Sequence, residues 1–414
     1  MGLRSVAWIV ALAALPTEAS ASGFLLYEQS APALAKGSAM VASARDPSAA
    51  WFNPASLAFV PAAGVALNTA LLLPHTRFSP KAIAGTPAVD VVAPSDRQLV
   101  PSLFAHVPLG DRFTLSLAVL APFALKVSWP NDWVGAQESL SSSVVVVSAN
   151  PSLAARLGDR FSIAAGVNVM RATVDLALAL PTPPGGTGSL SGIAWGLGAN
   201  AGVLYRALPD QLHLGLSYRS RVRLPFRGRA AFDVKTRPSP TALPDQGVSA
   251  NVTLPDVMAI GVMWRPHPQL ELSFQVDWVL WSTFDNLLID FEKTNNPPDR
   301  TIQRGGTDPV TGRVGAEWRF LDPNLVVRGG IAFDQSSSRA DSTSASAPDG
   351  HRVGLGTGLG WAFGRVTVDI AYFYAYFLPT VASGPNAHPE GTYHSGAHVL
   401  ALTVGVGGGG PQVR

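Results

Sequence analysis

The segment SGFLLYEQSAPALAKGSAMVASARDPSAAWFNPASLAFV (residues 22–60) differs from the rest of the chain. It is rich in alanine and serine, and its apolar residues do not alternate with polar ones as they do in a strand. Near its end lies Asn53-Pro54-Ala55. Proline fixes φ and asparagine often bonds nearby backbone groups, so this tripeptide predicts the exit into the first strand. We therefore interpret residues 22–60 as a plug inside the β-structure of residues 61–414.

Composition restricts the class of protein. The chain has 414 residues, of which 47% are hydrophobic and 14% are charged, against about 25% charged in soluble domains. After the N-terminus no apolar run is long enough for a transmembrane helix. The net charge of +2 predicts no nucleic-acid partner, and the absence of cysteine excludes disulfides and thiolate sites. Such a chain is a large soluble β-protein or a membrane barrel.

The first residues predict a signal peptide. Arg4 supplies a positive charge, residues 6–15 form an apolar stretch too short to span a bilayer, and Ala19-Ser20-Ala21 fits the small-residue rule for cleavage. We therefore assign residues 1–21 to the signal peptide and place the mature start at Ser22. The alternative is a buried N-terminal helix, but it would not require these three features in this order.

Short and long breaks alternate along the rest of the chain. Gly, Pro and Asp predict tight turns at residues 109–112, 157–160, 208–211, 266–269, 321–324 and 363–365. Longer polar breaks lie at residues 78–96, 127–141, 181–189, 233–247, 292–309, 335–350 and 380–392. Outer-membrane barrels have short periplasmic turns and long outer loops. The predicted fold is therefore all-β: a 14-stranded antiparallel transmembrane β-barrel plugged by an N-terminal hatch.

Strand-like alternation recurs between these breaks. Apolar residues occupy every second position of residues 270–280, 314–320 and 366–376, and polar or small residues fill most positions between them. A membrane barrel exposes the apolar face, whereas a soluble sandwich buries it. The signal peptide, the strand lengths and the uncharged apolar faces favour the membrane barrel, so we expect a protein of the Gram-negative outer membrane.

The same alternation in residues 212–226 places Arg219, Arg221 and Arg223 on one face. If that face is inward, these side chains form a basic row in the lumen. The fixed donors of a guanidinium group suit a carboxylate, so the row is a candidate substrate-binding site. The alternative is pairing with inward acids such as Glu271. We expect most of the row to be paired and one arginine to remain for a ligand.

A barrel of this size is too wide for side chains to fill, so the plug must close it and leave room for a solute. Phe24, Leu25 and Leu26 are candidates to line an apolar pocket between plug and wall, or alternatively to anchor the plug. In the third strand Pro122 interrupts residues 113–125. Proline cannot donate to a strand ladder, and a closed barrel has no edge strand for it. We predict a kink that opens a lateral gap; the alternative is a harmless bulge.

Several short segments together resemble one family. They are residues 23–24, 53–55, 215–220, 226–228, 254–256, 281–284 and 330–336, in the order found in that family. On these residues the chain resembles the FadL-type outer-membrane transporters of long-chain fatty acids and other hydrophobic compounds. The resemblance implies a fourteen-stranded barrel with a hatch that closes at Asn53-Pro54-Ala55. The chain departs from the family at its end, where GGGGPQVR follows Val406 and such barrels usually have an aromatic residue.

The resemblance also implies two site assignments. The family has a kinked third strand with a lateral opening, which we place at Pro122 and Phe123. It has a basic residue on the fifth strand, to which Arg171 corresponds. Arg171 shares its phase with the outward Ile163 and Val169, so it would face inward only beyond a bulge.

Two further features have open interpretations. Gly354, Gly356, Gly358 and Gly360 share one face of a strand and predict free space in the lumen, or only conformational slack. Trp129 and Trp133 in an outer loop predict an apolar landing surface for the ligand, or ordinary anchoring at the membrane interface.

The predicted function is passive uptake of long-chain fatty acids or similar hydrophobic molecules across the outer membrane. The ligand is held between hatch and wall and released sideways near the third strand. Uptake of aromatic hydrocarbons is one alternative. A barrel enzyme is another, but neither Gly-x-Ser-x-Gly nor His-Glu-x-x-His occurs, so we predict no enzyme, cofactor or metal site. Expected partners are the hydrophobic ligand, outer-membrane lipid and lipopolysaccharide, and the protein is expected to be a monomer.

Overall fold

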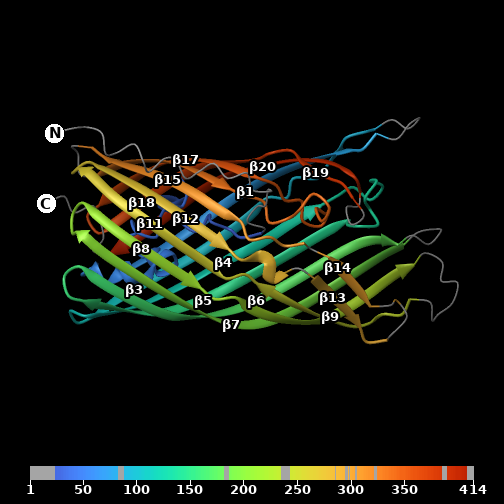
Figure 1. Cartoon of the computed structure of the whole chain (residues 1–414), viewed down its shortest axis with the longest axis horizontal. Coiled ribbons are helices and arrows are strands. Elements are labelled where there is room, and N and C mark those ends of the chain that lie inside the picture. The colour runs from blue at the N-terminus through green and yellow to red at the C-terminus, as the bar shows by residue number, and fades with distance from the viewer. Residues whose placement is uncertain are drawn as a thin grey trace.

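Fourteen antiparallel strands close into a barrel around the N-terminal segment (Figure 1). The computed structural model describes residues 24–82, 88–180, 186–234, 243–284, 286–293, 297, 299–303, 305–320, 324–384 and 389–407. The predicted signal peptide and the mature start at Ser22 lie outside the described residues. Within these ranges no helix is long and apolar enough to cross a membrane.

Several crossings of the wall consist of two strand segments. The strands are β1 (Gly64–Pro80), β2 (Val91–Val92), β3 (Gln98–Leu109), β4 (Phe113–Ser128), β5 (Ser141–Leu157), β6 (Phe161–Leu180), β7 (Gly186–Leu208), β8 (Leu212–Arg219), β9 (Val222–Val234), β10 (Gln246–Leu254), β11 (Val257–His267), β12 (Leu270–Val279), β13 (Asn286–Phe291), β14 (Arg300–Gln303), β15 (Val310–Arg319), β16 (Leu325–Asp334), β17 (Arg352–Phe363), β18 (Val366–Phe377), β19 (Thr380–Ala382) and β20 (Gly391–Gly407). The helical elements are α1 (Ala31–Ala35), α2 (Ala49–Phe52), η1 (Pro54–Phe59) and η2 (Trp281–Phe284).

The barrel closes between its first and last strands. β1 pairs with β20 along its whole length, from Gly64 opposite Gly407 to Pro80 opposite Gly391. The short turns gather at one end, on the left in Figure 1, and the outer extensions β9, β13 and β14 lie at the other. The strand ends confirm the predicted short turns, although residues 321–323 of one turn lie outside the description. Gly110 and Gly158 occupy two of these turns with φ of 70° and 81°, a backbone region that glycine enters without steric cost.

The side chains alternate between lipid and lumen as a membrane barrel requires. In β12 the predicted apolar face is outward: Phe274 and Trp278 are 44% and 39% exposed, whereas Glu271 and Asp277 are buried inside. β15 and β18 follow the same rule over their predicted faces. The exposed apolar face excludes the soluble sandwich, in which that face would be the core.

Residues 212–226 break this rule, and the predicted inward arginine row is wrong. β8 ends at Arg219 and β9 begins at Val222, and the interruption shifts the phase by one residue. Before it the even positions are exposed; after it Val222 and other even positions are buried, so Arg221 and Arg223 point out of the barrel. Asp256, in the break between β10 and β11, stabilises the interruption: its carboxylate accepts from the backbone N–H of Arg221 at 3.0 Å and from Arg221 Nε at 2.7 Å.

The hatch lies against opposite sides of the lumen. α1 contacts β16, β17, β18 and β20, whereas η1 contacts β4 to β7. Ser30 caps α1, since its side chain accepts from Ala33 N. Asn53 caps η1 by accepting from Ala55 N, and its Nδ2 donates to Val41 O in the hatch and to Val203 O in the wall. Asn53-Pro54-Ala55 thus joins hatch to barrel next to the start of β1.

Charged side chains of β12 and β15 hold the hatch against the barrel wall. Lys36 Nζ lies 3.3 Å from Glu271 Oε1, and Arg313 Nη1 donates to Gly37 O at 3.0 Å. Arg313 is itself held by Asp277 at 2.6 Å and Asp334 at 3.1 Å. The inward acids are therefore paired with cations of the hatch and of neighbouring strands, and not with the predicted arginine row.

The glycine row of β17 faces inward, and the hatch fills the space beside its two middle members, Gly356 and Gly358. A Cβ added to Gly356 would collide with Leu34 O and lie 2.9 Å from Ala35 O, and one added to Gly358 would lie 2.7 Å from the Ala35 Cβ. Glycine is required here because α1 packs its backbone directly on the wall. The predicted lumen space is therefore occupied at Gly356 and Gly358, whereas Gly360 lines a cavity of about 120 Å³.

Replacing Gly356 with alanine is expected to loosen the hatch. The new methyl group meets backbone atoms that cannot rotate away, so the cost is about 1–3 kcal/mol, as for other overpacked sites. We expect faster proteolysis of the hatch and higher background current in planar bilayers. The matched control is Gly312→Ala in β15, where a Cβ meets nothing within 4 Å. Equal behaviour of the two variants would contradict this account of the close packing.

Trp129 and Trp133 lie in the core of the outer loops. Their rings stack with centroids 4.2 Å apart, and both side chains are buried beside Phe78 and Tyr393. Trp129 Nε1 donates to Ala345 O at 3.0 Å, which links two loops far apart in the sequence. The predicted exposed landing surface at these tryptophans is wrong, since the rings are used to tie the loops together.

Candidate functional site

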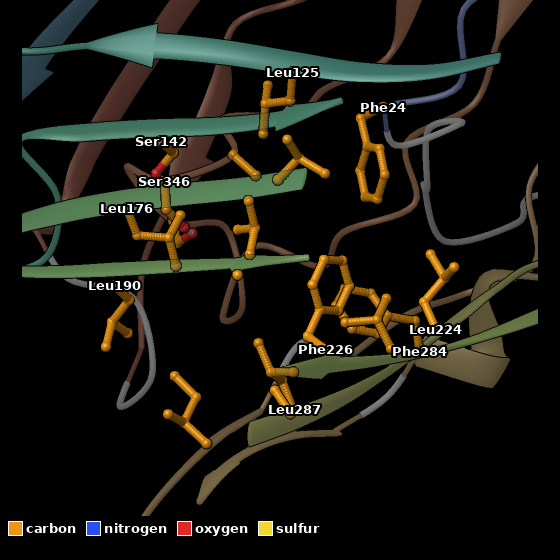
Figure 2. Close-up of a pocket in the computed structure, with 18 of the residues that line it drawn as sticks. Phe24, Leu125, Ser142, Leu176, Leu190, Leu224, Phe226, Phe284, Leu287 and Ser346 are labelled. Carbon is orange, nitrogen blue, oxygen red and sulfur yellow. Dashed lines mark hydrogen bonds between the residues drawn. The ribbon is translucent and has the colours of Figure 1, made fainter. Parts of the chain in front are cut away.

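An apolar cavity opens inside the outer half of the barrel. Its volume is about 190 Å³, and side chains from β5, β6, β7, β9, β10 and β13 line it. Figure 2 shows Phe24 and Leu125 facing Leu224, Phe226 and Phe284 across the open space. The mouth is more polar, because serines of the loop before β17 border it. The apolar walls of this cavity suit an apolar solute.

Three aromatic rings form the floor of this outer cavity. The ring centroid of Phe24 lies 5.0 Å from that of Trp281 and 5.8 Å from that of Phe123, and the latter two are 6.0 Å apart. They come from the hatch, from η2 and from the third crossing strand. Edge-to-face aromatic contacts of this kind are worth about 0.5–1.5 kcal/mol each, so the floor is a cohesive partition that a solute must displace.

A second, smaller cavity lies beyond the partition. Its volume is about 70 Å³, and Leu25, Leu26, Phe123, Met170 and Arg219 are among its lining residues. Leu254 lines both cavities. The two cavities therefore lie on either side of the N-terminal segment of the hatch, between it and the barrel wall.

Arg219 is the cation of the inner cavity. Its guanidinium group lies 3.4 Å from the ring centroid of Trp51 and donates to Trp51 O. Nη1 donates to the amide oxygens of Asn150 and Asn168, at 3.3 and 3.2 Å. All of these acceptors are neutral, and Arg219 forms no ion pair with any residue that the structure describes. The site thus presents a positive charge without a protein counter-ion beside apolar walls.

The barrel wall parts at Pro122, next to the inner cavity. β3 pairs with β4 only from Leu103 opposite Val119 down to the short turn. Beyond Val119, β5 is the only described strand that pairs with β4, and the register between these two strands shifts between Leu120 and Phe123. Proline cannot donate to a ladder, and the extra residue of a bulge bends the strand. The wall is thus interrupted at this proline as the sequence suggested, and the irregularity in the pairing with β5 is of the β-bulge type.

The hatch occupies the resulting gap. Leu26 N donates to Pro122 O at 2.8 Å, and Ala124 N donates to Phe24 O at 3.1 Å, so residues 24–26 pair with the free edge of β4. Gln29 spans the gap with its side chain: Nε2 donates to Ala121 O at 2.9 Å, and Oε1 accepts from Ser102 Oγ at 3.0 Å. The opening in the wall is sealed by hatch residues that also divide the two cavities.

The profile of the outer membrane protein transport protein family, OMPP1/FadL/TodX, matches residues 12–406. The chain belongs to this family. It is a protein of the Gram-negative outer membrane, and the resemblance drawn from its sequence is confirmed.

Individual members show how the chain relates to the OMPP1/FadL/TodX family. The long-chain fatty acid transport protein of Escherichia coli K12 is 26% identical over 411 residues, covering 89% of this chain and 90% of that protein. Outer membrane protein P1 of Haemophilus influenzae is 26% identical over 66% of this chain and 65% of its own length. The crystal structure of a Pseudomonas aeruginosa FadL homologue superposes with a TM-score of 0.81 at 19% identity, covering 93% of this chain and 99% of that one. The crystal structure of the Pseudomonas putida toluene transporter TodX superposes with a TM-score of 0.68 at 14% sequence identity. The superposition covers 94% of this chain and 99% of that one.

The predicted site residues of this family member divide into two groups. Phe24 lines the outer cavity and Leu25 and Leu26 line the inner one, while Pro122 and Phe123 lie at the gap. Arg219 joins them. Arg171, Arg221 and Arg223 do not, because all three are exposed on the outside of the barrel. No bulge intervenes between β6 and β7 at Arg171, which keeps the outward phase expected from its register.

Sequence reasoning missed three residues of the site. Trp281 closes the floor of the outer cavity, Trp51 stacks on Arg219, and Gln29 bridges the gap. Trp281 begins a segment that carried the family resemblance, which was a usable signal. Nothing in the sequence distinguishes Gln29 or Trp51 from other hatch residues, since their partners lie far away in the chain.

Proposed function

We propose that this transporter takes up long-chain fatty acids, or amphiphilic acids of similar shape, across the outer membrane. The observation that carries the proposal is the position of Arg219: one cation without a described acidic partner, at the inner end of an apolar route. A carboxylate would supply the missing counter-ion, and an alkyl chain would fill the apolar walls. Arginine suits this task because its planar donors match a carboxylate.

The proposed route has three stages. The solute enters the outer cavity from the loops and reaches the partition of Phe24, Phe123 and Trp281. Displacement of the hatch segment then admits it to the inner cavity beside Arg219. Release of residues 24–26 from the edge of β4 opens the gap at Pro122, and the solute leaves sideways into the bilayer. An apolar molecule on this route never crosses an aqueous lumen, so hydrophobic transfer favours each stage.

Replacing Arg219 with glutamine tests the proposed head-group site. Loss of a hydrogen bond to a charged group costs about 1.5–3 kcal/mol, so the Kd for palmitate is expected to rise about 10- to 100-fold. The measurement is displacement of a fluorescent fatty acid from the protein in detergent. The control is Arg223→Gln, which removes an exposed outward arginine that has no ion pair with any described residue, and Arg219→Lys is expected to retain part of the affinity. Unchanged palmitate binding by Arg219→Gln would contradict the head-group role.

Uptake of aromatic hydrocarbons is the second candidate. It is favoured by the aromatic floor of the outer cavity and by the structural similarity to a toluene transporter. An uncharged ligand gains little from a guanidinium group, so toluene binding is expected to be the same in Arg219→Gln and in the unmodified protein. A protein that binds toluene but not palmitate would establish this second function.

A further inference from the structure

A group of basic residues lies on the outside of the barrel, remote from the transport route. Arg171 of β6 lies opposite Trp195 of β7. Arg227 of β9 lies opposite Ile193, which is two residues from Trp195 on the same strand β7. A Cβ added to Gly196 would lie 2.6 Å from the carbonyl oxygen of Arg223, which places Arg223 beside the same segment. These four side chains, Arg171, Trp195, Arg223 and Arg227, are all exposed and form one outward area that we call the interface patch.

The interface patch lies where the apolar belt of the wall ends. Counted from the short turn, the last large apolar outward residue of β6 is Val169, and the next outward residue is Arg171. On the neighbouring β7 the last large apolar outward residue is Ile193, two residues beyond Trp195. In β8 the last is Tyr218, and Arg221 follows after the interruption. Trp195 is 61% exposed, and tryptophan collects at the boundary between hydrocarbon and head groups. The patch is therefore at the level of the outer-leaflet head groups.

The charges of the interface patch are not matched by the protein. Arg221 is paired with Asp256 at 2.7 Å and Arg229 with Asp245 at 3.3 Å. In contrast, Arg171, Arg223 and Arg227 form no ion pair with any residue in the described part of the chain. Asp175, on the outward face of β6, is exposed but is not bonded to Arg171. Three unmatched cations at one membrane boundary can bind the anionic head group of a lipid.

We propose that the interface patch binds the phosphate groups of an outer-leaflet lipid of the lipid A type, the membrane anchor of lipopolysaccharide. Guanidinium groups bind phosphate oxygens in a bidentate manner, and Trp195 would pack against the apolar part of the same molecule. A lipid fits better than free phosphate because the patch is continuous with the apolar belt. The site lies outside the lumen, so the inference does not depend on which solute is transported.

The test compares lipid binding by the purified protein in detergent micelles. Fluorescent lipid A with both phosphates is the probe. The variant Arg171→Gln/Arg223→Gln/Arg227→Gln is expected to bind it at least 10-fold more weakly, since each lost bond to a charged group is worth about 10-fold or more. The matched control is Arg229→Gln, on the same strand and exposed but already paired with Asp245. The unmodified protein should bind dephosphorylated lipid A at least 10-fold more weakly than the intact form.

Three results would overturn the proposal. The first is equal lipid A affinity in the triple variant and the unmodified protein, with the barrel shown to be folded by its heat-dependent mobility in gels. The second is equal affinity for dephosphorylated lipid A. The third is displacement of lipid A by inorganic phosphate alone at micromolar concentration, which would identify a site for the free anion. If the triple variant fails to fold, Arg223→Gln alone carries the test, with a weakening of about 10-fold expected.

Discussion

Oxidation of a Leu25→Cys/Phe123→Cys variant is expected to abolish uptake of a long-chain fatty acid, and reduction is expected to restore it. The two residues face each other in the antiparallel bridge between hatch and β4. Opposed residues in such pairs have Cα atoms about 4.5–5.5 Å apart, which is within the range of a disulfide. The chain has no cysteine of its own, so a bond between the introduced thiols is the only one that can form.

The expected loss of uptake follows from the double role of residues 24–26. They seal the gap at Pro122, and they separate the outer cavity from the inner one. The proposed route requires that residues 24–26 move aside between the two cavities and that they leave the edge of β4. A covalent bond to β4 prevents both movements. Uptake by cells should therefore fall to the level of cells without the protein, and a reductant should return it to the level of the reduced variant.

The controls separate the cross-link from the substitutions. Leu25→Cys and Phe123→Cys alone remove the side chains without the bond, so they set the baseline of uptake for each substitution, and the oxidant should not change the uptake of either. Formation of the bond is checked by proteolysis near residue 46. A cross-linked hatch stays attached to the barrel after this cleavage, whereas a free one is released. Uptake that continues at the full rate with the bond formed would show that the solute does not pass this segment, and would point to the periplasmic end of the lumen.

Removal of residues 24–48 is expected to convert a closed protein into a conducting channel. This deletion takes away α1, Lys36 and the chain packed against β16, β17 and β18, while η1 remains against β4 to β7. The exposed lumen wall would then carry Glu271, Asp277 and Arg313, which favour water and ions. A barrel of this width is open to solvent when nothing fills it.

The measurement is ion current across planar bilayers. The unmodified protein should show no lasting openings, and the deletion variant should show stable conductance that rises with salt concentration. Lys36→Met, which removes one contact of the hatch without deleting it, is the milder comparison and should give only brief openings. A deletion variant that stays closed would mean that the outer loops, tied together around Trp129 and Trp133, close the barrel by themselves.

The position of each inward residue depended on the phase of its strand. For β12, β15 and β18 the sequence determined that phase, because the apolar and polar positions alternate without interruption. In residues 212–226 the same pattern misplaced Arg221 and Arg223. A one-residue shift reverses every later side chain. The interruption is bonded to Asp256, a residue 35 positions away from Arg221.

The sequence by itself determined the barrel, its fourteen strands and the plug, and it predicted an interruption at Pro122. Alternation, turn residues and the missing N–H of proline are local properties, so they can be read without knowing what lies beside them. Only the tertiary structure decided what fills the lumen and the gap. Arg219 rather than its neighbours lies beside the inner cavity, Gln29 bridges β3 and β4, and Gly356 makes room for α1. These contacts join residues distant in the chain, and whether they form depends on register and packing across the lumen, which no local pattern contains.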